Sequence, residues 1–270
     1  MNEAAQRQAL ADYAVRMHRS GWVANHDGNL SLRLTANRFL ATPTSTSKAE
    51  VTPSSIVLVD GGGAVLGRGK VFSEIGLHLA VFRHRPDVHA VVHAHPPTAT
   101  GFAVAGITLP EPFIAEALVS LGGTIPLVPT AAPGPAAVAA LEPFIADHDA
   151  VLLGNHGCLA WGKTVEQAFL RLELVEHLAK ITLVAQQLGG PRPLPRPQVA
   201  SMMEARRKAG LGLAADRASG GSISEDPPTI IACAPAPIGA TVKVRERGKI
   251  PDAHALAAMI REELERSLRK

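Results

Sequence analysis

The chain has 270 residues, of which 46% are hydrophobic and 19% are charged, a composition typical of a folded domain with a sizeable core. The formal net charge is only +3, and the Lys and Arg residues are scattered except near the C-terminus, which argues against a nucleic-acid-binding surface. No apolar run reaches bilayer-spanning length, and the start resembles an amphipathic helix and not a signal peptide, so we expect a cytoplasmic protein without a membrane anchor.

The first predicted elements are a helix and three short strands. Residues 1–20 read as an amphipathic helix that ends at Ser20-Gly21. The segment ANHDGNLSLRL predicts a turn and then a strand with leucines at alternate positions. The run RFLAT is a second strand, broken by Pro43, and residues 56–60 form a third, followed by a glycine-rich turn that suggests a hairpin.

Helices and buried strands alternate in the middle of the chain. Ser73 occupies an N-cap position, so Glu74 is expected in the first turn of a helix that Arg85-Pro86 stops. VHAVVHAHPP and AVLLGNHG are short buried strands. A long helix over residues 164–188 follows, capped by Thr164 and ended by Gly189-Gly190-Pro191. The pattern predicts an α/β layered domain.

The C-terminal part of the chain differs in composition from the rest. We expect a globular domain over residues 1–213, a linker rich in Pro, Gly and Ser over residues 214–248, and a short amphipathic helix over residues 249–270. Cys158 and Cys233 are far apart and lack metal-ligand spacing, so we expect ordinary small apolar residues.

Three histidines suggest a metal site. In a strand, side chains two residues apart share a face, so His93 and His95 present two imidazoles together at the end of an apolar strand. His156 also follows an apolar strand, in a turn that ends with glycine. Three neutral imidazoles without a fourth protein ligand leave coordination positions open, as in catalytic zinc sites.

Other polar residues are less informative on their own. Spacing alone favours Glu74 as a carboxylate that interacts with a helix dipole. The turn around Gly28 and Asn29 would pass for a simple connection. The remaining histidines are interpreted as surface or packing residues, with His26 and His78 the least secure of them.

In combination, however, the motifs resemble the class II aldolase/adducin family, whose bacterial members include L-fuculose-phosphate aldolase. DGNLSLR, TPTSTSK, SEIGLH, RPDVHAVVHAHPPTAT and LLGNHG occur in the family's order within residues 8–212. The resemblance implies a central, mainly antiparallel β-sheet flanked by helices, commonly in a homotetramer with active sites at subunit boundaries.

The resemblance also implies a set of roles. His93, His95 and His156 would bind Zn²⁺, Glu74 would act as acid/base, and the phosphate of a sugar phosphate would be bound by residues of three segments: Gly28, Asn29, Thr44, Ser45 and Ser73. The expected reaction is cleavage of a ketose 1-phosphate, similar to L-fuculose 1-phosphate, to dihydroxyacetone phosphate and an aldehyde through a metal-stabilised enediolate. Epimerases, dehydratases and decarboxylases use the same chemistry and remain alternatives.

Three departures from the family pattern affect these expectations. Ser45 replaces a glycine that relatives usually have, and Phe72-Ser73 replaces a pair of serines, so one phosphate donor is lost. Related aldolases also use a tyrosine as proton donor, but Tyr13 is the only tyrosine in the chain.

Two further hypotheses concern partners. A non-catalytic role, as in the adducin branch, is an alternative for the whole domain. The linker and the helix at 249–270 resemble peptides that direct enzymes into bacterial microcompartments, which predicts binding to a shell protein.

Overall fold

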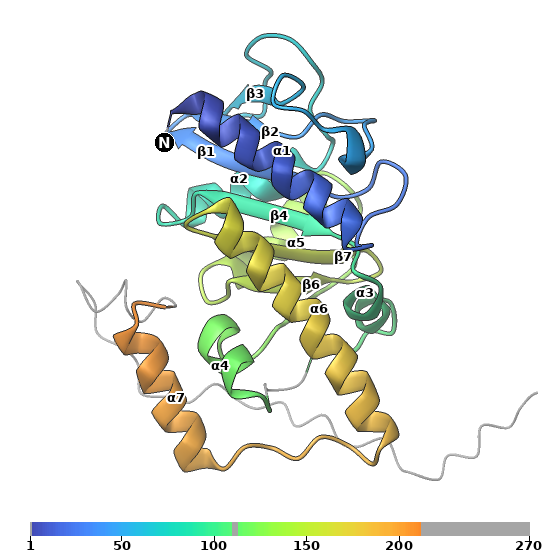
Figure 1. Cartoon of the computed structure of the whole chain (residues 1–270), viewed down its shortest axis with the longest axis vertical. Coiled ribbons are helices and arrows are strands. Elements are labelled where there is room, and N and C mark those ends of the chain that lie inside the picture. Colours follow the sequence, from blue (N-terminus) through green and yellow to red (C-terminus); the bar gives the residue numbers. More distant parts are fainter. Residues whose placement is uncertain (1, 110–112, 212–270) are drawn as a thin grey trace, which may run out of the picture. The chain divides into compact units, whose positions relative to one another are not determined.

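A seven-stranded sheet forms the centre of the computed structural model, which describes residues 2–109 and 113–211 (Figure 1). In spatial order its strands are β3 (Val57–Asp60), β2 (Arg38–Ala41), β1 (Asn29–Thr35), β4 (Ala90–Ala94), β7 (Gly157–Gly162), β6 (Ala150–Leu153) and β5 (Leu127–Val128). Every neighbouring pair is antiparallel except β5 and β6, which are parallel. The predicted α/β fold with a mainly antiparallel sheet is confirmed.

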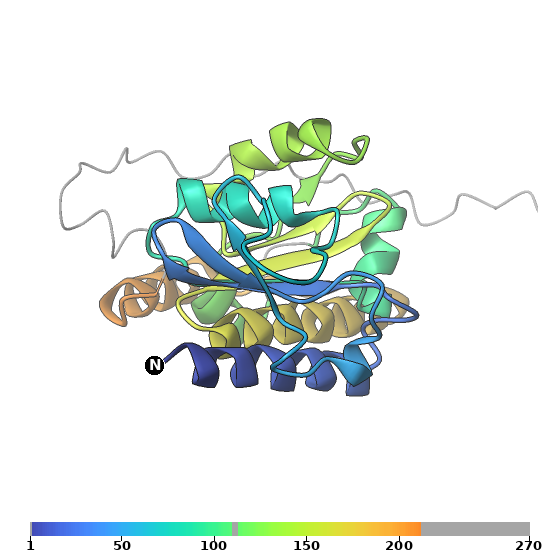
Figure 2. The same cartoon turned by 90° about the horizontal axis from the view of Figure 1, so that it is seen from above.

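Helices cover both faces of this sheet (Figure 2). The described residues form the helices α1 (Glu3–Arg19), η1 (Lys48–Glu50), α2 (Ile75–His84), α3 (Pro97–Val104), α4 (Ala115–Leu121), α5 (Pro135–Ile145), α6 (Val165–Gln187) and α7 (Arg196–Lys208). On one face lie α1 and α6, and on the other lie α2 and α5. In the described residues, no helix is both long and apolar enough to span a bilayer. The predicted linker and tail helix lie outside these residues.

Local sequence explains where the two longest helices begin and end. The Asn2 side chain accepts a hydrogen bond from the Ala5 N–H at 2.8 Å at the start of α1, and Thr164 accepts one from the Gln167 N–H at 3.1 Å at the start of α6. Gly189 follows α6 with φ of 106°, a conformation that glycine adopts without steric cost. The sequence predicted α6 from Thr164 and the glycines after it, and it predicted α1 from Ser20-Gly21 at its end, without the Asn2 cap.

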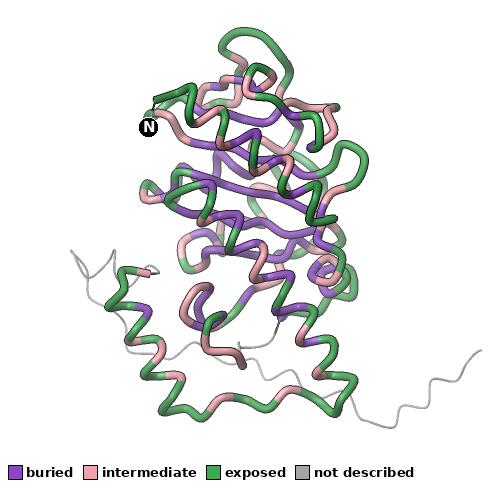
Figure 3. Tube along the Cα trace, in the orientation of Figure 1, coloured by how far each residue is buried: buried purple, intermediate pink, exposed green. Residues whose placement is uncertain are grey.

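The alternation of strand residues divides the core into two layers, and the strands between these layers are largely buried (Figure 3). Leu30, Leu32 and Val92 face the layer that holds α1 and α6. Val91 and Trp161 face the opposite layer, which holds α2 and α5. Because both faces are covered, β4 and β7 are buried along their whole length, and residues at their ends are shielded from water.

The starts of two helices differ from the expectations. Ser73 does not cap α2: the helix starts at Ile75, and Glu74 holds the N-cap position without a capping hydrogen bond, because its carboxylate is engaged elsewhere. Pro97 begins α3, a helix that the sequence did not predict, and proline's fixed φ suits the first helical position.

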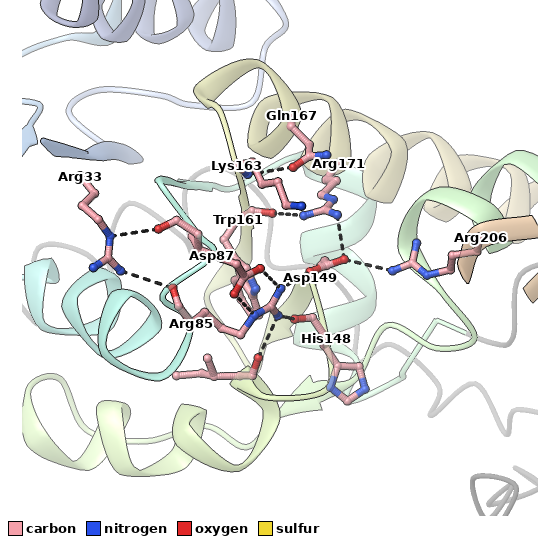
Figure 4. A network of polar contacts seen from close by, with 12 residues as sticks. Arg33, Arg85, Asp87, His148, Asp149, Trp161, Lys163, Gln167, Arg171 and Arg206 are labelled. Atoms are coloured by element: carbon pink, nitrogen blue, oxygen red, sulfur yellow. Dashed lines mark hydrogen bonds and ion pairs between the residues drawn. The ribbon is translucent and has the colours of Figure 1, made fainter. Parts of the chain in front are cut away.

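A buried charge network joins three helices to the start of β6 (Figure 4). Asp149 is 2% exposed and accepts from Arg85 at 3.1 Å, Arg171 at 2.8 Å and Arg206 at 3.0 Å. These arginines lie at the C-terminal end of α2, in α6 and in α7. Arg85 also forms a bidentate salt bridge with Asp87. The network holds α2, α6 and α7 together beside the start of β6.

Candidate metal centre and active site

His93 and His95 lie at the end of β4, in the middle of the sheet. The strand register pairs His93 with Asn29 of β1 on one side and with Leu159 of β7 on the other, and His93 is 1% exposed. The backbone N–H of His95 donates to the Trp22 carbonyl at 2.9 Å. Backbone pairing therefore holds both residues and fixes the point from which each imidazole side chain extends.

His156 enters the site from the tight turn between β6 and β7. Asn155 has φ of 54°, and the His156 N–H donates to the Leu153 carbonyl at 3.0 Å. A Cβ atom at Gly157 would lie only 2.5 Å from Cδ2 of His95. Glycine at this position therefore allows the turn to approach β4 closely enough for His156 to join the other histidines.

The three imidazoles converge. Ring centroids are separated by 4.9 Å for His93–His95, 4.7 Å for His93–His156 and 5.0 Å for His95–His156, and one nitrogen from each ring lies within 4.8 Å of the others. Nδ1–H of His93 donates to the Cys158 carbonyl at 2.8 Å, so Nε2 carries the free lone pair that faces His95. This donor set fits a tetrahedral metal ion with an open position.

Glu74, at the N-terminal end of α2, lies beside the three histidines. Its Oε1 lies 3.0 Å from Nε2 of His156, and its Oε2 lies 3.5 Å from Nε2 of His93. The Asn29 side-chain amide donates to Oε2 at 3.0 Å. The carboxylate is thus oriented by an amide donor and lies directly beside the group of imidazoles.

Burial and hydrogen bonding set the protonation states. Burial lowers the pKa of His93 to about 4, and burial together with the neighbouring His156 lowers the pKa of His95. The hydrogen bond with Glu74 raises the pKa of His156. Burial raises the pKa of Glu74, but the hydrogen bond from His156 and the charges of His93 and His156 outweigh burial and hold it well below its usual range. At neutral pH Glu74 is a carboxylate, and His93 is the neutral imidazole that metals bind.

A cavity of about 310 Å³ opens in front of these groups. All of the residues predicted to bind phosphate line it, namely Gly28, Asn29, Thr44, Ser45 and Ser73. Glu74, His95 and His156 line it as well, whereas the more deeply buried His93 does not. The structure therefore places two of the predicted metal ligands, the proton-transfer residue and the anion-binding residues on one cavity, and the His93 ring lies against His95 and His156.

Two charged residues of this cavity were missed by sequence reasoning. Asp27 lies 3.6 Å from Nδ1 of His95, where a carboxylate can orient the ring. Lys48 is 2% exposed and also lines the cavity. Asp27 directly precedes the Gly28 turn and could have been suspected from that position, but nothing in the local sequence shows that the Lys48 side chain turns inward.

His78 has a structural position beside the site. It is fully buried, its Nδ1 is 2.7 Å from Oγ of Ser31, and its ring packs against Phe72 with centroids 5.0 Å apart. Burial lowers the pKa of His78 to about 3. It is therefore a neutral packing residue, as expected.

The departures from the family pattern have visible consequences. Ser45 adopts φ of 53°, a left-handed conformation that glycine would adopt without strain. Phe72 is 7% exposed and presents an aromatic ring where a hydroxyl was expected. Tyr13 packs against Phe169 of α6, with ring centroids 5.2 Å apart, and is not among the residues that line the cavity.

Several curated proteins are similar to this chain. A 5-methylthioribulose-1-phosphate/5-deoxyribulose-1-phosphate aldolase of Rhodospirillum rubrum is 33% identical over 205 residues, which cover 74% of this chain and 90% of the relative. A 3-oxo-tetronate 4-phosphate decarboxylase of Escherichia coli strain K12 is 31% identical over 197 residues, 71% of this chain and 91% of the relative. A methylthioribulose-1-phosphate dehydratase of Methylococcus capsulatus is 32% identical over 171 residues, 58% of this chain and 83% of the relative.

Solved structures have the same architecture. An L-fuculose 1-phosphate aldolase superposes with a TM-score of 0.69 at 28% identity and covers 74% of this chain and 95% of its own. YgbL of Escherichia coli superposes with a TM-score of 0.67 at 30% identity and covers 74% of this chain and 98% of its own. The model of the class II aldolase and adducin N-terminal domain matches residues 8–183. The chain therefore belongs to the class II aldolase and adducin family.

Proposed function

We propose that this protein is a zinc-dependent aldolase that cleaves a ketose 1-phosphate, of the L-fuculose 1-phosphate type, to dihydroxyacetone phosphate and an aldehyde. The observation that supports it most is the convergence of His93, His95 and His156 with the Glu74 carboxylate at one cavity. Similar proteins include aldolases of sugar 1-phosphates. An interaction protein would have no need to retain all four of these groups together.

His93, His95 and His156 would hold the zinc ion through one nitrogen each, since their ring nitrogens face one another. When bound, zinc supplies Lewis-acid charge beside the substrate carbonyl. The Cys158 carbonyl fixes the tautomer of His93, and the Asp27 carboxylate lies beside Nδ1 of His95. Such partners keep the ligand rings in position.

Glu74 would move the proton at the carbon next to the carbonyl. Its low pKa makes it an ionised base at neutral pH, and the Asn29 amide keeps Oε2 in place. In cleavage, the hydroxyl on the neighbouring carbon loses its proton and becomes the aldehyde carbonyl, and the electron pair of the broken carbon–carbon bond stays on the carbon next to the ketone. That carbon then receives a proton through Glu74, so the proton lost and the proton gained balance. In the reverse direction the same carboxylate removes that proton.

A second candidate reaction keeps these groups and breaks a different bond. Similar proteins at 31 to 32% identity are a decarboxylase and a dehydratase. In a dehydratase, Glu74 would remove a proton from carbon, and the resulting carbanion would expel hydroxide. In a decarboxylase, the carbanion would instead form by loss of carbon dioxide. The same fold can host all of these reactions, as well as epimerisation, so the substrate and its products must identify the reaction.

A substrate panel tests the proposal. Zinc-loaded protein would be incubated with L-fuculose 1-phosphate, 5-deoxyribulose 1-phosphate and methylthioribulose 1-phosphate. Aldol cleavage predicts dihydroxyacetone phosphate, detected by its reduction with NADH and glycerol-3-phosphate dehydrogenase. A product lighter by one water would instead identify a dehydratase, and no turnover of any member would reject the aldolase assignment for these sugars.

Variants separate the roles within the site. His156→Ala is expected to lose bound zinc, while the control His177→Ala, on the exposed face of α6, should keep it, as measured by elemental analysis. Glu74→Gln should keep zinc but lose activity by roughly 100-fold to 10,000-fold. A wild-type protein that takes up no zinc would favour the adducin-like, non-catalytic alternative.

A further inference from the structure

Lys48 is a buried cation on the wall of the active-site cavity. It is the first residue of η1 and is 2% exposed, yet it lines the cavity together with His156. Its Nζ donates to the His26 carbonyl at 3.0 Å and to the Thr46 carbonyl at 3.1 Å. The ammonium group thus joins two loops that are distant in sequence and that both border the cavity.

The charge of Lys48 is not neutralised by the protein around it. Within residues 2–109 and 113–211, no carboxylate forms an ion pair with Nζ, and the two carbonyls are its acceptors. An ammonium group has three N–H donors, so one donor lacks a partner there. Asp27 contributes attraction, but its carboxylate is 47% exposed and lies nearer to His95. Buried charges are normally paired, so this cation calls for an anionic ligand.

The amine keeps its charge at neutral pH. Burial lowers the pKa of Lys48 to about 8, and the attraction of Asp27 acts against that shift. An anion bound in the cavity would favour the charged form further.

We propose that Lys48 is the anion-recognition residue of this cavity and that it selects a phosphorylated substrate, an inference that rests on the proposed function of the same site. Three hydroxyl-bearing residues, Thr44, Ser45 and Ser73, line the same cavity as Lys48. A phosphate has enough outer oxygens to accept from the ammonium and from several hydroxyls at once, whereas a carboxylate has two. Lys48 thereby supplies the donor strength that the Phe72 ring cannot.

Equilibrium binding of inorganic phosphate to the full-length protein tests this role. Isothermal titration calorimetry would compare wild type, Lys48→Met and the control Lys208→Met, whose side chain is 72% exposed on α7. Lys48→Met is expected to weaken phosphate binding by at least about 10-fold, while Lys208→Met leaves it unchanged. The titrations are repeated with acetate and with dihydroxyacetone, and before and after zinc removal, which separates binding at Lys48 from binding at the metal.

Two results would overturn the proposal. One is equal phosphate affinity in wild type and Lys48→Met. The other is a parallel loss of phosphate and dihydroxyacetone binding with a lower unfolding temperature, which would make Lys48 a purely structural tie between two loops. If Lys48→Met does not fold, a crystal structure of the wild type with phosphate decides: a phosphate oxygen within hydrogen-bond distance of Nζ supports the role, and phosphate elsewhere contradicts it.

These measurements do not need turnover. A selective loss of phosphate affinity in Lys48→Met stands even if no ketose phosphate is cleaved. Cleavage with unaltered phosphate affinity would retain the proposed function and reject the role of Lys48.

Discussion

At Ser45 the backbone has a conformation that its side chain does not favour. Its φ of 53° places it in the left-handed region, where a residue other than glycine costs about 1–3 kcal/mol. Ser45→Gly should relieve this strain, and the greater entropy of glycine in the unfolded chain offsets part of the gain. We expect an increase of up to about 1 kcal/mol in the free energy of unfolding, measured by urea denaturation. A decrease of that size would show that the Ser45 hydroxyl stabilises the loop.

Cys158 contributes its carbonyl to the site while its thiol is inert. The side chain is 1% exposed, and burial raises the pKa of the thiol well above its usual range. Because a raised pKa keeps the thiol protonated up to strongly alkaline pH, Cys158 should not react with iodoacetamide at pH 8. Peptide mapping by mass spectrometry would show this peptide unmodified in the native protein and alkylated in guanidinium. Rapid alkylation without denaturant would contradict the buried position.

At the scale of elements, periodicity and caps predicted α1, α6 and the strands that hold the histidines. The helices between residues 97 and 145 were missed. In α5 the apolar residues are not confined to one face, and Pro143 lies inside the helix, whereas Pro135 is at its first position, which proline favours. Its sequence therefore offers no amphipathic stripe and one helix-breaking signal. Its helical state depends on packing against α2, which sequence alone does not show.

The candidate site, like the fold, could be predicted from the sequence only in part. His93, His95, His156 and Glu74 follow recognisable motifs, and the pairing of β4 with β7 explains why they meet. Lys48 could not be assigned, because its role depends on how its side chain reaches the loop that contains His26, a tertiary contact that the local sequence does not show.

The Asp149 network predicts a large stability effect. Asp149→Asn removes the charge that Arg85, Arg171 and Arg206 share, and breaking a buried pair in this way costs roughly 3–5 kcal/mol. We expect a loss of about 3 kcal/mol, since asparagine keeps one acceptor oxygen. Chemical denaturation measures it, with Glu173→Gln as control.

That control removes a carboxylate of a different kind. Glu173 pairs with Arg16 at 3.4 Å, and both side chains are more than 40% exposed, so its loss should cost less than about 1 kcal/mol. Equal effects of the two substitutions would mean that the Asp149 network does not hold α2, α6 and α7 to the sheet.

At the scale of the whole molecule, an apolar surface on α3 and α6 suggests how copies of this chain associate. Ile107, just after α3, is 44% exposed, and Leu183 of α6 is 43% exposed. Both border a mainly apolar hollow of about 380 Å³ that Phe102 also lines. Exposed apolar patches of this kind mark interaction surfaces, and the family resemblance predicts a homotetramer. We propose that a second copy covers this surface.

Leu183→Glu tests the association, because it would place a charge in the proposed interface, where desolvation makes it costly. Sedimentation velocity should show a species of lower mass than the wild-type oligomer. Leu170→Glu is a closely matched control: it changes the same residue type on the same helix, 42% exposed, but lines a different groove. A monomeric wild type, or dissociation by Leu170→Glu and not by Leu183→Glu, would show that copies do not meet at this surface.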